Sequence, residues 1–390
     1  MGQRISITFG LPLMTYLDNA ATSFPKPEET LQHLTHFVSS VGGNPGRSGH
    51  PLSIDAARII FQAREKLTAF INGKHSERLI FTHNGTESLN LAILGLVQEH
   101  DHVITTSMEH NSVMRPLDFL QKEKKVEIST VPCSAFGELD LATLKTYLKK
   151  NTRVVIINHG SNVIGTVQSI RQVREAIGET TLILDACQTI GNMPIDVQAE
   201  GVDIICFSCH KSLFGIQGLG ALYMRKGINL RPLKFGGTGS KSESIRQPEI
   251  LPDKYESGTP NTPGIAALLG GLTFIEKTGL SAIIEKKKAI REYTLRVLSD
   301  VDDVIIYGHP SGEGLPIISA NIKEMSPSDV GTACNRADIC VRVGLHCAPV
   351  AHRTIGSFPQ GTVRISPGYF TREEEIDRLA EVFKTLVRKR

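Results

Sequence analysis

The chain of 390 residues is 40% hydrophobic and 21% charged, with a formal net charge of +3 at pH 7. This length can bury a full hydrophobic core and predicts two domains. The small net charge, with both signs mixed along the chain, argues against a dedicated nucleic-acid surface, and no apolar run approaches the roughly 18 residues needed to span a bilayer.

The N-terminus and the cysteines bear on where the protein works. Residues 1–14 contain one Arg and a short apolar patch but no small-residue cleavage site, so we expect an N-terminal extension, with Met14 as an alternative start. There are seven cysteines, an odd number, and no export signal is recognisable. Reduced thiols and a cytoplasmic location are therefore expected.

The first two-thirds of the chain alternate between short apolar runs and helical patterns. Seven runs predict strands, at 78–82, 102–106, 126–131, 153–160, 181–188, 202–208 and 220–224. Several are nearly continuous Val, Ile and Leu, which is typical of strands buried on both faces of a mainly parallel sheet. Residues 86–100 between two of these runs show helical spacing of leucines. The pattern predicts an α/β fold with a doubly wound sheet and ligands at the carboxyl ends of its strands.

From about residue 262 the character changes to a smaller α+β domain. Helical patterns at 262–279 and 280–300 are followed by strands at 303–308, 316–322, 340–344 and 362–368, with helices at 326–338 and 371–390. We expect a large domain over 15–262, whose N-terminal segment can pack on the other domain, and a small domain over 263–390. The lysines at 286–288 are interpreted as a solvated helix face.

Two loops rich in Gly, Pro and Ser, at 41–53 and 235–263, are long for a compact domain. Loops of this length are usually functional, so a role in the site or in subunit contact is expected.

The first predicted strand ends in "HNGTESLN", which opens a helix. Gly85 and Thr86 would present backbone N–H groups and a hydroxyl at the helix N-terminus, which suits a phosphate. The alternative is that Thr86 only caps the helix.

Asp185 ends a predicted strand that otherwise consists of Ile and Leu. A carboxylate at the end of a buried strand costs free energy unless it is paired, and a protonated ring nitrogen is a suitable partner. The alternative is a cap on a following helix.

The segment "FSCHKSLFGIQGLGALYM" places Ser208, His210 and Lys211 at the end of a strand, before a glycine-rich turn. A lysine in this position, near a carboxylate on another strand, suits a Schiff base with an aldehyde cofactor. Ser208 and His210 can add hydrogen bonds to a phosphate. "GIQGLG" has the wrong spacing for a dinucleotide fingerprint. Cys206 and Cys209 are three apart on a strand and point opposite ways, so buried structural thiols are favoured over a shared metal or disulfide.

Cys347 lies in "CVRVGLHCAPVAHRTIG", residues 340–356. The local sequence leaves four roles open: disulfide partner, metal ligand, buried apolar residue or nucleophile. A zinc site with His346 and His352 lacks a clear fourth ligand, and no metal is expected.

These motifs together resemble the cysteine desulfurases, pyridoxal-phosphate (PLP) enzymes of the class V aminotransferase superfamily. The matching motifs occur in family order and are "YLDNAAT", "GTESLN", "MEHNS", "SNVIGT", "LDACQ", "SCHK", "ESGTPNTPG", "RVGLHCAP" and "VRIS". The resemblance implies a PLP-dependent transferase fold of type I, with a seven-stranded large-domain sheet and a small C-terminal domain carrying the cysteine loop. It also implies a homodimer that acts on L-cysteine and passes sulfur to an acceptor protein.

The resemblance further implies roles for residues at matching positions. Lys211 would form the Schiff base with the cofactor, Asp185 would hold the pyridine nitrogen protonated, and His110 would stack on the ring and move protons. Gln188 would contact the ring hydroxyl. The phosphate would be held by Gly85, Thr86, Ser208 and His210, and by Thr259 reaching the neighbouring subunit.

Substrate contacts and the nucleophile follow in the same way. Asn162 and Arg364 would bind the substrate carboxylate, Arg364 as a bidentate fork, and Ala20 would lie along the substrate. Arg47 and His50 would line the entrance. Cys347 would attack the substrate sulfur as a thiolate, and the nearby cations that could favour the thiolate are Arg342, His346, His352 and Arg353.

The loop pattern R-x-G-x-x-C-A is similar to that of the short-loop group of the family. Selenocysteine lyase is the alternative activity, followed by another class V activity such as an aminotransferase or a kynureninase-like cleavage. A non-catalytic scaffold for a sulfur carrier is the alternative outside enzymes. Leu345–His346 replaces the paired histidines of many relatives, which leaves the choice of acceptor and of sulfur or selenium open.

Overall fold

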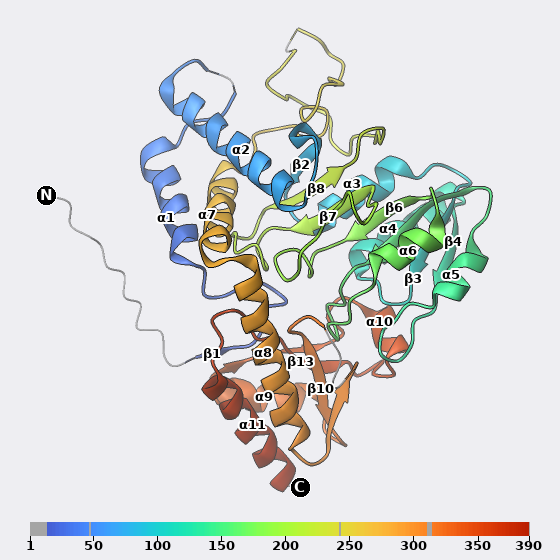
Figure 1. Ribbon diagram of the computed structural model, residues 1–390, viewed down its shortest axis with the longest axis vertical. Coiled ribbons are helices and arrows are strands. Elements are labelled where there is room, and N and C mark those ends of the chain that lie inside the picture. The colour runs from blue at the N-terminus through green and yellow to red at the C-terminus, as the bar shows by residue number, and fades with distance from the viewer. Residues whose placement is uncertain (1–13, 47, 242, 310–313, 390) are drawn as a thin grey trace, which may run out of the picture.

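The computed structural model describes residues 14–46, 48–241, 243–309 and 314–389. All seven runs predicted as strands in the first two-thirds of the chain form one sheet (Figure 1). Its strands are β2 (Leu79–Thr82), β3 (His102–Thr106), β4 (Glu127–Val131), β5 (Thr152–Asn158), β6 (Thr181–Asp185), β7 (Ile204–Ser208) and β8 (Gly220–Met224).

The strand order of this sheet is β2-β8-β7-β6-β5-β3-β4. β8 is antiparallel to both of its neighbours, and the other pairs are parallel. The predicted mainly parallel, seven-stranded sheet is therefore confirmed. The carboxyl ends of β3, β5, β6 and β7 share one edge, which is where an open α/β sheet binds ligands.

Helices cover both faces of the sheet, as a doubly wound fold requires. The helices of this part of the molecule are α1 (Glu28–His36), η1 (Phe37–Val41), α2 (Pro51–Phe70), η2 (Ser76–Arg78), α3 (Gly85–Leu96), α4 (Asn111–Lys124), α5 (Leu141–Tyr147), α6 (Ile170–Ile177) and α7 (Thr262–Thr278). One core contains apolar residues of α3 and α4, and the other contains those of α2, α6 and α7.

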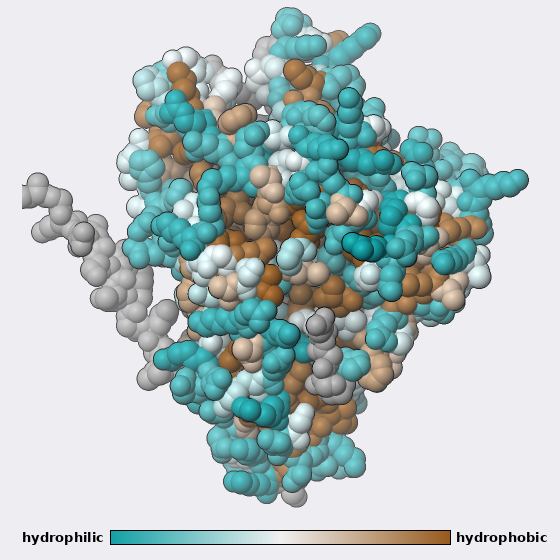
Figure 2. All heavy atoms as spheres, in the orientation of Figure 1, coloured by the Kyte–Doolittle hydropathy of each residue, from teal (hydrophilic) through white to brown (hydrophobic). Residues whose placement is uncertain are grey.

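Apolar side chains also reach the surface. Leu31, Val38, Ile54 and Phe61 on α1, η1 and α2 are exposed, and Figure 2 shows apolar atoms at the surface over the upper part of α2. Phe235, Ile245 and Ile250 are exposed on the long loop that precedes α7.

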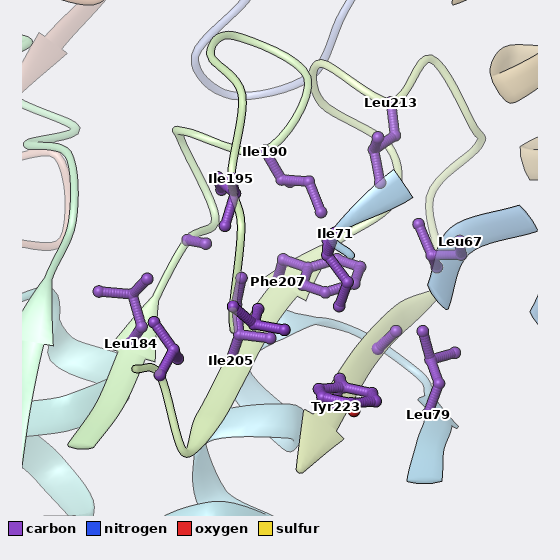
Figure 3. Close-up of a cluster of buried hydrophobic side chains, with 14 of the residues drawn as sticks. Leu67, Ile71, Leu79, Leu184, Ile190, Ile195, Ile205, Phe207, Leu213 and Tyr223 are labelled. Carbon is purple, nitrogen blue, oxygen red and sulfur yellow. The ribbon is translucent and has the colours of Figure 1, made fainter. Parts of the chain in front are cut away.

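The core beneath the sheet forms because alternate strand residues point to the same face. Leu184, Ile205 and Phe207 project from neighbouring strands towards Leu67 and Ile71 (Figure 3). Ile183 and Ile204 belong to the core on the opposite face. This buried scaffold fixes the strand ends that carry the polar residues of the site.

A second, antiparallel sheet of order β12-β13-β10-β9 forms the lower part of the molecule in Figure 1. Its elements are α8 (Leu280–Ser299), β9 (Val304–Tyr307), β10 (Ile318–Ile322), α9 (Pro327–Arg336), β12 (Arg342–Gly344), α10 (Pro349–Thr354), β13 (Thr362–Ile365) and α11 (Glu373–Arg388). Apolar residues of α8, α9 and α11 share a core with β10 and β13.

The strand predicted over 340–344 is two strands with different partners. β11 (Ile339–Cys340) pairs in parallel with β1 (Thr15–Tyr16), whereas β12 pairs with β13. The apolar pattern could not reveal that the pairing partner changes within this run, because each strand pairs with a segment from elsewhere in the chain. Leu17, which follows β1, lies in the core of the second sheet.

The predicted boundary at 262 falls where α7 begins, and α7 packs against α1 and α2 beside the large sheet. α8 then carries the chain onwards, with Ile283 in the core of the large sheet and Ile290 in the core of the small one. The division at 262 stays a prediction.

In the part of the chain that the structure describes, no single helix has the length and apolar character needed to cross a membrane. α7 and α8 meet that test only together, and they are bent by 86° at their junction.

Candidate active site

A cavity of about 120 Å³ opens at the shared carboxyl edge of the large sheet. Nine of the predicted site residues line it: Gly85, Thr86, His110, Asn162, Asp185, Gln188, Ser208, His210 and Lys211. These residues come from the ends of five strands (β2, β3, β5, β6 and β7) and from the segments after them, so the sheet brings together positions up to 126 residues apart. Asn158 and Cys187 also line the cavity and were not predicted.

The corner next to α3 has the features of a phosphate site. A Cβ atom on Gly85 would lie 2.5 Å from Cys187 Sγ and 3.3 Å from the backbone nitrogen of Ser208, so only glycine fits without a shift. The alternative role of Thr86 as helix cap is wrong, since Asn84 caps α3 by accepting a hydrogen bond from the Glu87 N–H at 2.9 Å.

Two buried polar atoms beside this corner have no hydrogen-bond partner among the described residues: Ser208 Oγ and His210 Nδ1. Buried polar groups are normally satisfied, so these atoms indicate a ligand. Burial, together with the charges of Lys211 and Lys26, lowers the pKa of His210 to about 4. A neutral imidazole, a hydroxyl and the N-terminus of α3 fit the phosphate of PLP.

Lys211 follows β7 and lies near Asp185 at the end of β6. Burial lowers the pKa of Lys211, an effect that the charges of Cys187 and Asp185 oppose and those of Arg364 and Arg342 reinforce. Asp185 is 4% exposed, and its Oδ1 accepts a hydrogen bond from the Cys187 N–H at 2.9 Å. The alternative role of Asp185 as a helix cap is wrong, since residues 186–203 form no α-helix.

His110 is the N-cap of α4, and its Nδ1 accepts a hydrogen bond from the Ser112 N–H at 3.1 Å. Burial lowers the pKa of His110 to about 4, which favours the neutral ring with its proton on Nε2.

The preceding residue, Glu109, is fully buried, and its Oε1 accepts hydrogen bonds from Thr106 Oγ1 at 2.7 Å and the Asn158 N–H at 2.9 Å. Burial raises the pKa of Glu109 to about 8. The motif "MEHN" could have drawn attention to Glu109, but nothing in the sequence reports that it is buried.

The carbonyl oxygen of His210, in the peptide bond before Lys211, accepts several hydrogen bonds. They come from Lys26 Nζ at 2.7 Å, Thr22 Oγ1 at 3.1 Å and the Ser23 N–H at 3.2 Å. The segment after β1 therefore holds the backbone at Lys211, a contribution that the sequence analysis missed.

The predicted substrate residues Asn162 and Arg364 contact each other, Ala20 contacts Gln188, and the polar groups that make these contacts are already engaged. Arg364 is 1% exposed, and its Nη2 pairs with Asp18 Oδ1 at 2.7 Å while its Nη1 donates to the Asn162 carbonyl at 3.0 Å. The Arg364 guanidinium is therefore not free to bind a carboxylate through two hydrogen bonds, as expected, because its Nη2 already pairs with Asp18. Gln188 Nε2 donates to the Ala20 carbonyl at 3.0 Å, so the two predicted positions touch.

Cys347 is an exposed, free thiol between β12 and α10, which removes the buried and disulfide alternatives. The loop is anchored twice: the Asn111 N–H donates to the Cys347 carbonyl at 2.8 Å, and Asn162 Nδ2 donates to the His346 carbonyl at 2.8 Å. His346 and Cys347 have φ angles of 48° and 58°, in the left-handed region that non-glycine residues rarely adopt. The two anchors hold this turn against the cavity.

Of the four cations proposed to favour the thiolate, Arg342 contacts it, with Nη2 at 3.5 Å from Sγ. The other three are engaged elsewhere. His346 and His352 bond to Thr362 and Ser357, and burial lowers their pKa to about 2 and about 4, so neither carries a charge at neutral pH. The Arg353 guanidinium lies over the ring of Phe358.

The remaining predicted residues lie apart. Thr259 lines a different cavity, together with His83 and Lys234. His50 caps α2, accepting a hydrogen bond from the Ser53 N–H at 3.2 Å. Arg47 and residues 1–13 lie outside the described residues. Cys206 and Cys209 are buried and free, as expected for structural thiols.

Residues 15–379 match the family model described as aminotransferase class V. A probable cysteine desulfurase of Methanothermobacter thermautotrophicus is 32% identical over 388 residues, covering 96% of each chain. A cysteine desulfurase of Pectobacterium atrosepticum is 32% identical over 384 residues, covering 95% of this chain and 92% of the relative. The chain belongs to the class V aminotransferase family, among the cysteine desulfurases.

Solved structures agree with this assignment. The apo cysteine desulfurase from Thermococcus onnurineus NA1 superposes with a TM-score of 0.91 at 28% identity, covering 97% of this chain and 95% of the other. The cysteine desulfurase CsdA from Escherichia coli has a TM-score of 0.87 at 23% identity, covering 96% and 95%, and supports the fold alone. The predicted fold type I of PLP enzymes is thereby confirmed, as is membership of a PLP-dependent family.

Proposed function

We propose that this chain is a cysteine desulfurase that converts L-cysteine to L-alanine and keeps the sulfur as a persulfide on Cys347. The observation that carries the proposal is a single contact: Asn162, which lines the cavity with Lys211 and Asp185, holds the loop of Cys347 through the His346 carbonyl. A base, a buried carboxylate and an exposed thiol are thereby gathered at one site.

The residues present fit PLP, the cofactor of the family. Gly85, Thr86, Ser208 and His210 would hold its phosphate, Lys211 would hold its aldehyde, and Asp185 would pair with its ring nitrogen. When bound, the cofactor supplies an electron sink that stabilises negative charge at the substrate Cα.

The protein supplies the proton transfers. Because burial lowers the pKa of Lys211, its amine has a larger neutral fraction than an exposed lysine and can accept the substrate Cα proton. Neutral His110 carries a proton on Nε2 and can donate it within the cavity. Arg364 and the side chain of Asn162 would bind the substrate carboxylate, and Asp18 would have to share the Arg364 guanidinium with it.

The sulfur transfer balances without an added oxidant. Cys347 thiol and L-cysteine give Cys347 persulfide and L-alanine: a sulfur–sulfur bond forms, the substrate carbon–sulfur bond breaks, and the carbon takes a proton. The reacting form of Cys347 is the thiolate, and the Arg342 guanidinium lies beside it, with Nη2 at 3.5 Å from Sγ.

The test is alanine formation from L-cysteine by wild-type protein, Cys347→Ala and Lys211→Ala. We expect each substitution to lower the rate at least ~100-fold, since each removes a group that changes its bonds in the reaction. Cys347→Ala should still bind the cofactor, whereas Lys211→Ala should lose the absorbance change seen on borohydride reduction. Full activity of Cys347→Ala on cysteine would show that the nucleophile is wrongly assigned.

Selenocysteine lyase stays the alternative activity, and the same variants address it. A selenol is a better leaving group than a thiol, so selenide release depends less on Cys347. A wild-type preference for selenocysteine, retained in Cys347→Ala, would favour the lyase.

We further propose a homodimer and a separate sulfur-acceptor protein that docks near Cys347. Exposed apolar side chains on α1, η1 and α2, and on the loop before α7, support an interface there. Thr259, in the cavity with His83, would reach the phosphate of the partner. A cytoplasmic location stays a prediction from the cysteine content.

A further inference from the structure

The lysine run at 286–288 does not form a uniformly solvated helix face. Lys286 and Lys288 are exposed on α8, but Lys287 between them is 5% exposed. The interpretation of this run as a solvated face is therefore wrong for Lys287. A buried ammonium is costly unless its charge and its three N–H donors are satisfied.

Lys287 is only partly satisfied by its surroundings. Its Nζ donates to Asn192 Oδ1 at 2.7 Å and lies 5.3 Å from the centre of the Phe214 ring. Within the described residues no carboxylate lies within ion-pair distance of it, in contrast to Lys254, which is equally buried and pairs with Glu249 at 2.6 Å. Among the described residues, Lys287 is therefore a buried lysine without an ion-pair partner.

A small cavity adjoins this ammonium where the two sheets meet. Its volume is about 20 Å³, and Lys287, Asn192, Ser212, Ser23 and Tyr369 are among its lining residues. That volume admits one water-sized occupant. Lys286 adds positive charge at the rim, since its Nζ lies 4.5 Å from the centre of the Tyr369 ring.

We propose that this cavity binds a small monovalent inorganic anion of the halide class, held by the Lys287 ammonium. A halide supplies a negative charge to pair with the Lys287 ammonium, and it accepts hydrogen bonds from the ammonium N–H groups that do not donate to Asn192. The lining has a hydroxyl on Ser212 as a further donor, and its small volume excludes larger organic anions. Burial also lowers the pKa of Lys287 to about 7, an effect that a bound anion opposes.

The site connects to the candidate active site through side-chain amides. Asn192, which accepts from Lys287, donates through Nδ2 to the Gln188 carbonyl at 2.7 Å. Gln188 in turn donates to the Ala20 carbonyl at 3.0 Å. An anion at Lys287 would thus help fix the segment that carries Gln188.

The first experiment is a bromide soak of crystals of the full chain, read by anomalous diffraction. We expect an anomalous peak within hydrogen-bond distance of Lys287 Nζ. A cavity that holds only water, or is empty, at saturating bromide overturns the proposal. This readout needs no variant and no catalytic activity.

The second experiment measures the melting temperature in chloride and in gluconate at equal ionic strength. Binding to the folded state alone should raise the melting temperature with saturating dependence on chloride, by about 2 °C, and gluconate should not. Lys287→Met should abolish the chloride-specific increment. The matched variant Lys254→Met, which removes an equally buried but paired lysine, should retain it. An increment that persists in Lys287→Met overturns the proposal.

Discussion

Protonation of individual residues in this site is set by burial more than by pairing. Glu109, His110 and His210 lie within or beside the cavity, and for each the largest cause of the pKa shift is burial. The neutral forms therefore dominate near pH 7.

Glu109→Gln tests whether burial sets the protonation of Glu109, a residue that the sequence did not single out. The folded-state pKa of Glu109 is raised from 4.5 to about 8, so the folded protein binds more protons than the unfolded one between these values. Its stability contribution is full below pH 4.5 and is lost as the pH rises through 8. Gln keeps the Oε1 acceptor and cannot ionise, so Glu109→Gln should be more stable than wild type at pH 9, by on the order of 4 kcal/mol.

The measurement is the free energy of unfolding of both proteins from pH 5 to 9. The advantage of Glu109→Gln should grow with pH and vanish near pH 5. Glu99→Gln, at an exposed glutamate, is the control and should track wild type throughout. A pH-independent difference would mean that Glu109 is ionised in the folded protein.

Where a helix or strand begins close to another segment of the chain, glycine allows the two to approach closely. Gly85 begins α3 against Cys187, and Gly220 begins β8, where a Cβ atom would lie 2.3 Å from the Asn84 carbonyl carbon. The first contact is with a side-chain sulfur and the second with backbone. A second substitution can therefore remove the clash made by a side chain at position 85, but not the clash made by one at position 220.

Gly85→Ala should weaken PLP binding at least ~10-fold, because the added methyl displaces the backbone that faces the phosphate. Cys187→Ala, which removes the sulfur 2.5 Å away, should restore much of the affinity in the double variant. Cofactor titration by absorbance measures both. Gly220→Ala combined with Cys187→Ala is the control and should show no recovery; equal recovery in both pairs would refute the contact.

At the scale of the whole molecule, the exposed apolar surface on α1, η1 and α2 predicts the dimer. Phe61 is 62% exposed, so Phe61→Asp should leave the fold of one chain intact while placing a charge in the interface. Light scattering should report a mass near 42.6 kDa for the variant and twice that for wild type. Phe119→Asp, at an exposed Phe on α4, is the control and should remain dimeric. If the wild type were monomeric, Thr259 could not complete the phosphate site of a second subunit, and that part of the proposal would be wrong.

Much of the architecture could be predicted from the sequence, because the causes are local. Continuous Val, Ile and Leu runs identify buried parallel strands. Asp185 stands out as a polar residue that ends such a strand, and Lys211 as one that follows shortly after the end of another. The parallel pairing of these strands then brings their ends to one edge. Seven of the nine predicted residues meet in one cavity for that reason. Gly85 and Thr86 join them from β2, which reaches the same edge through two antiparallel pairings.

Only the tertiary structure decided which neighbours those residues have. The division of 340–344 between β11 and β12 and the pairing of Asp18 with Arg364 join segments that lie apart in the chain. Arg342 is only five residues from Cys347, but the local sequence could not show that Arg342, rather than His346, contacts its thiol. Burial of Glu109 and Lys287 is of the same kind, because a residue's exposure depends on what packs over it. Sequence patterns report the periodicity of one segment. The ion pairs, the protonation states and the contacts of the site residues instead follow from how many segments pack together.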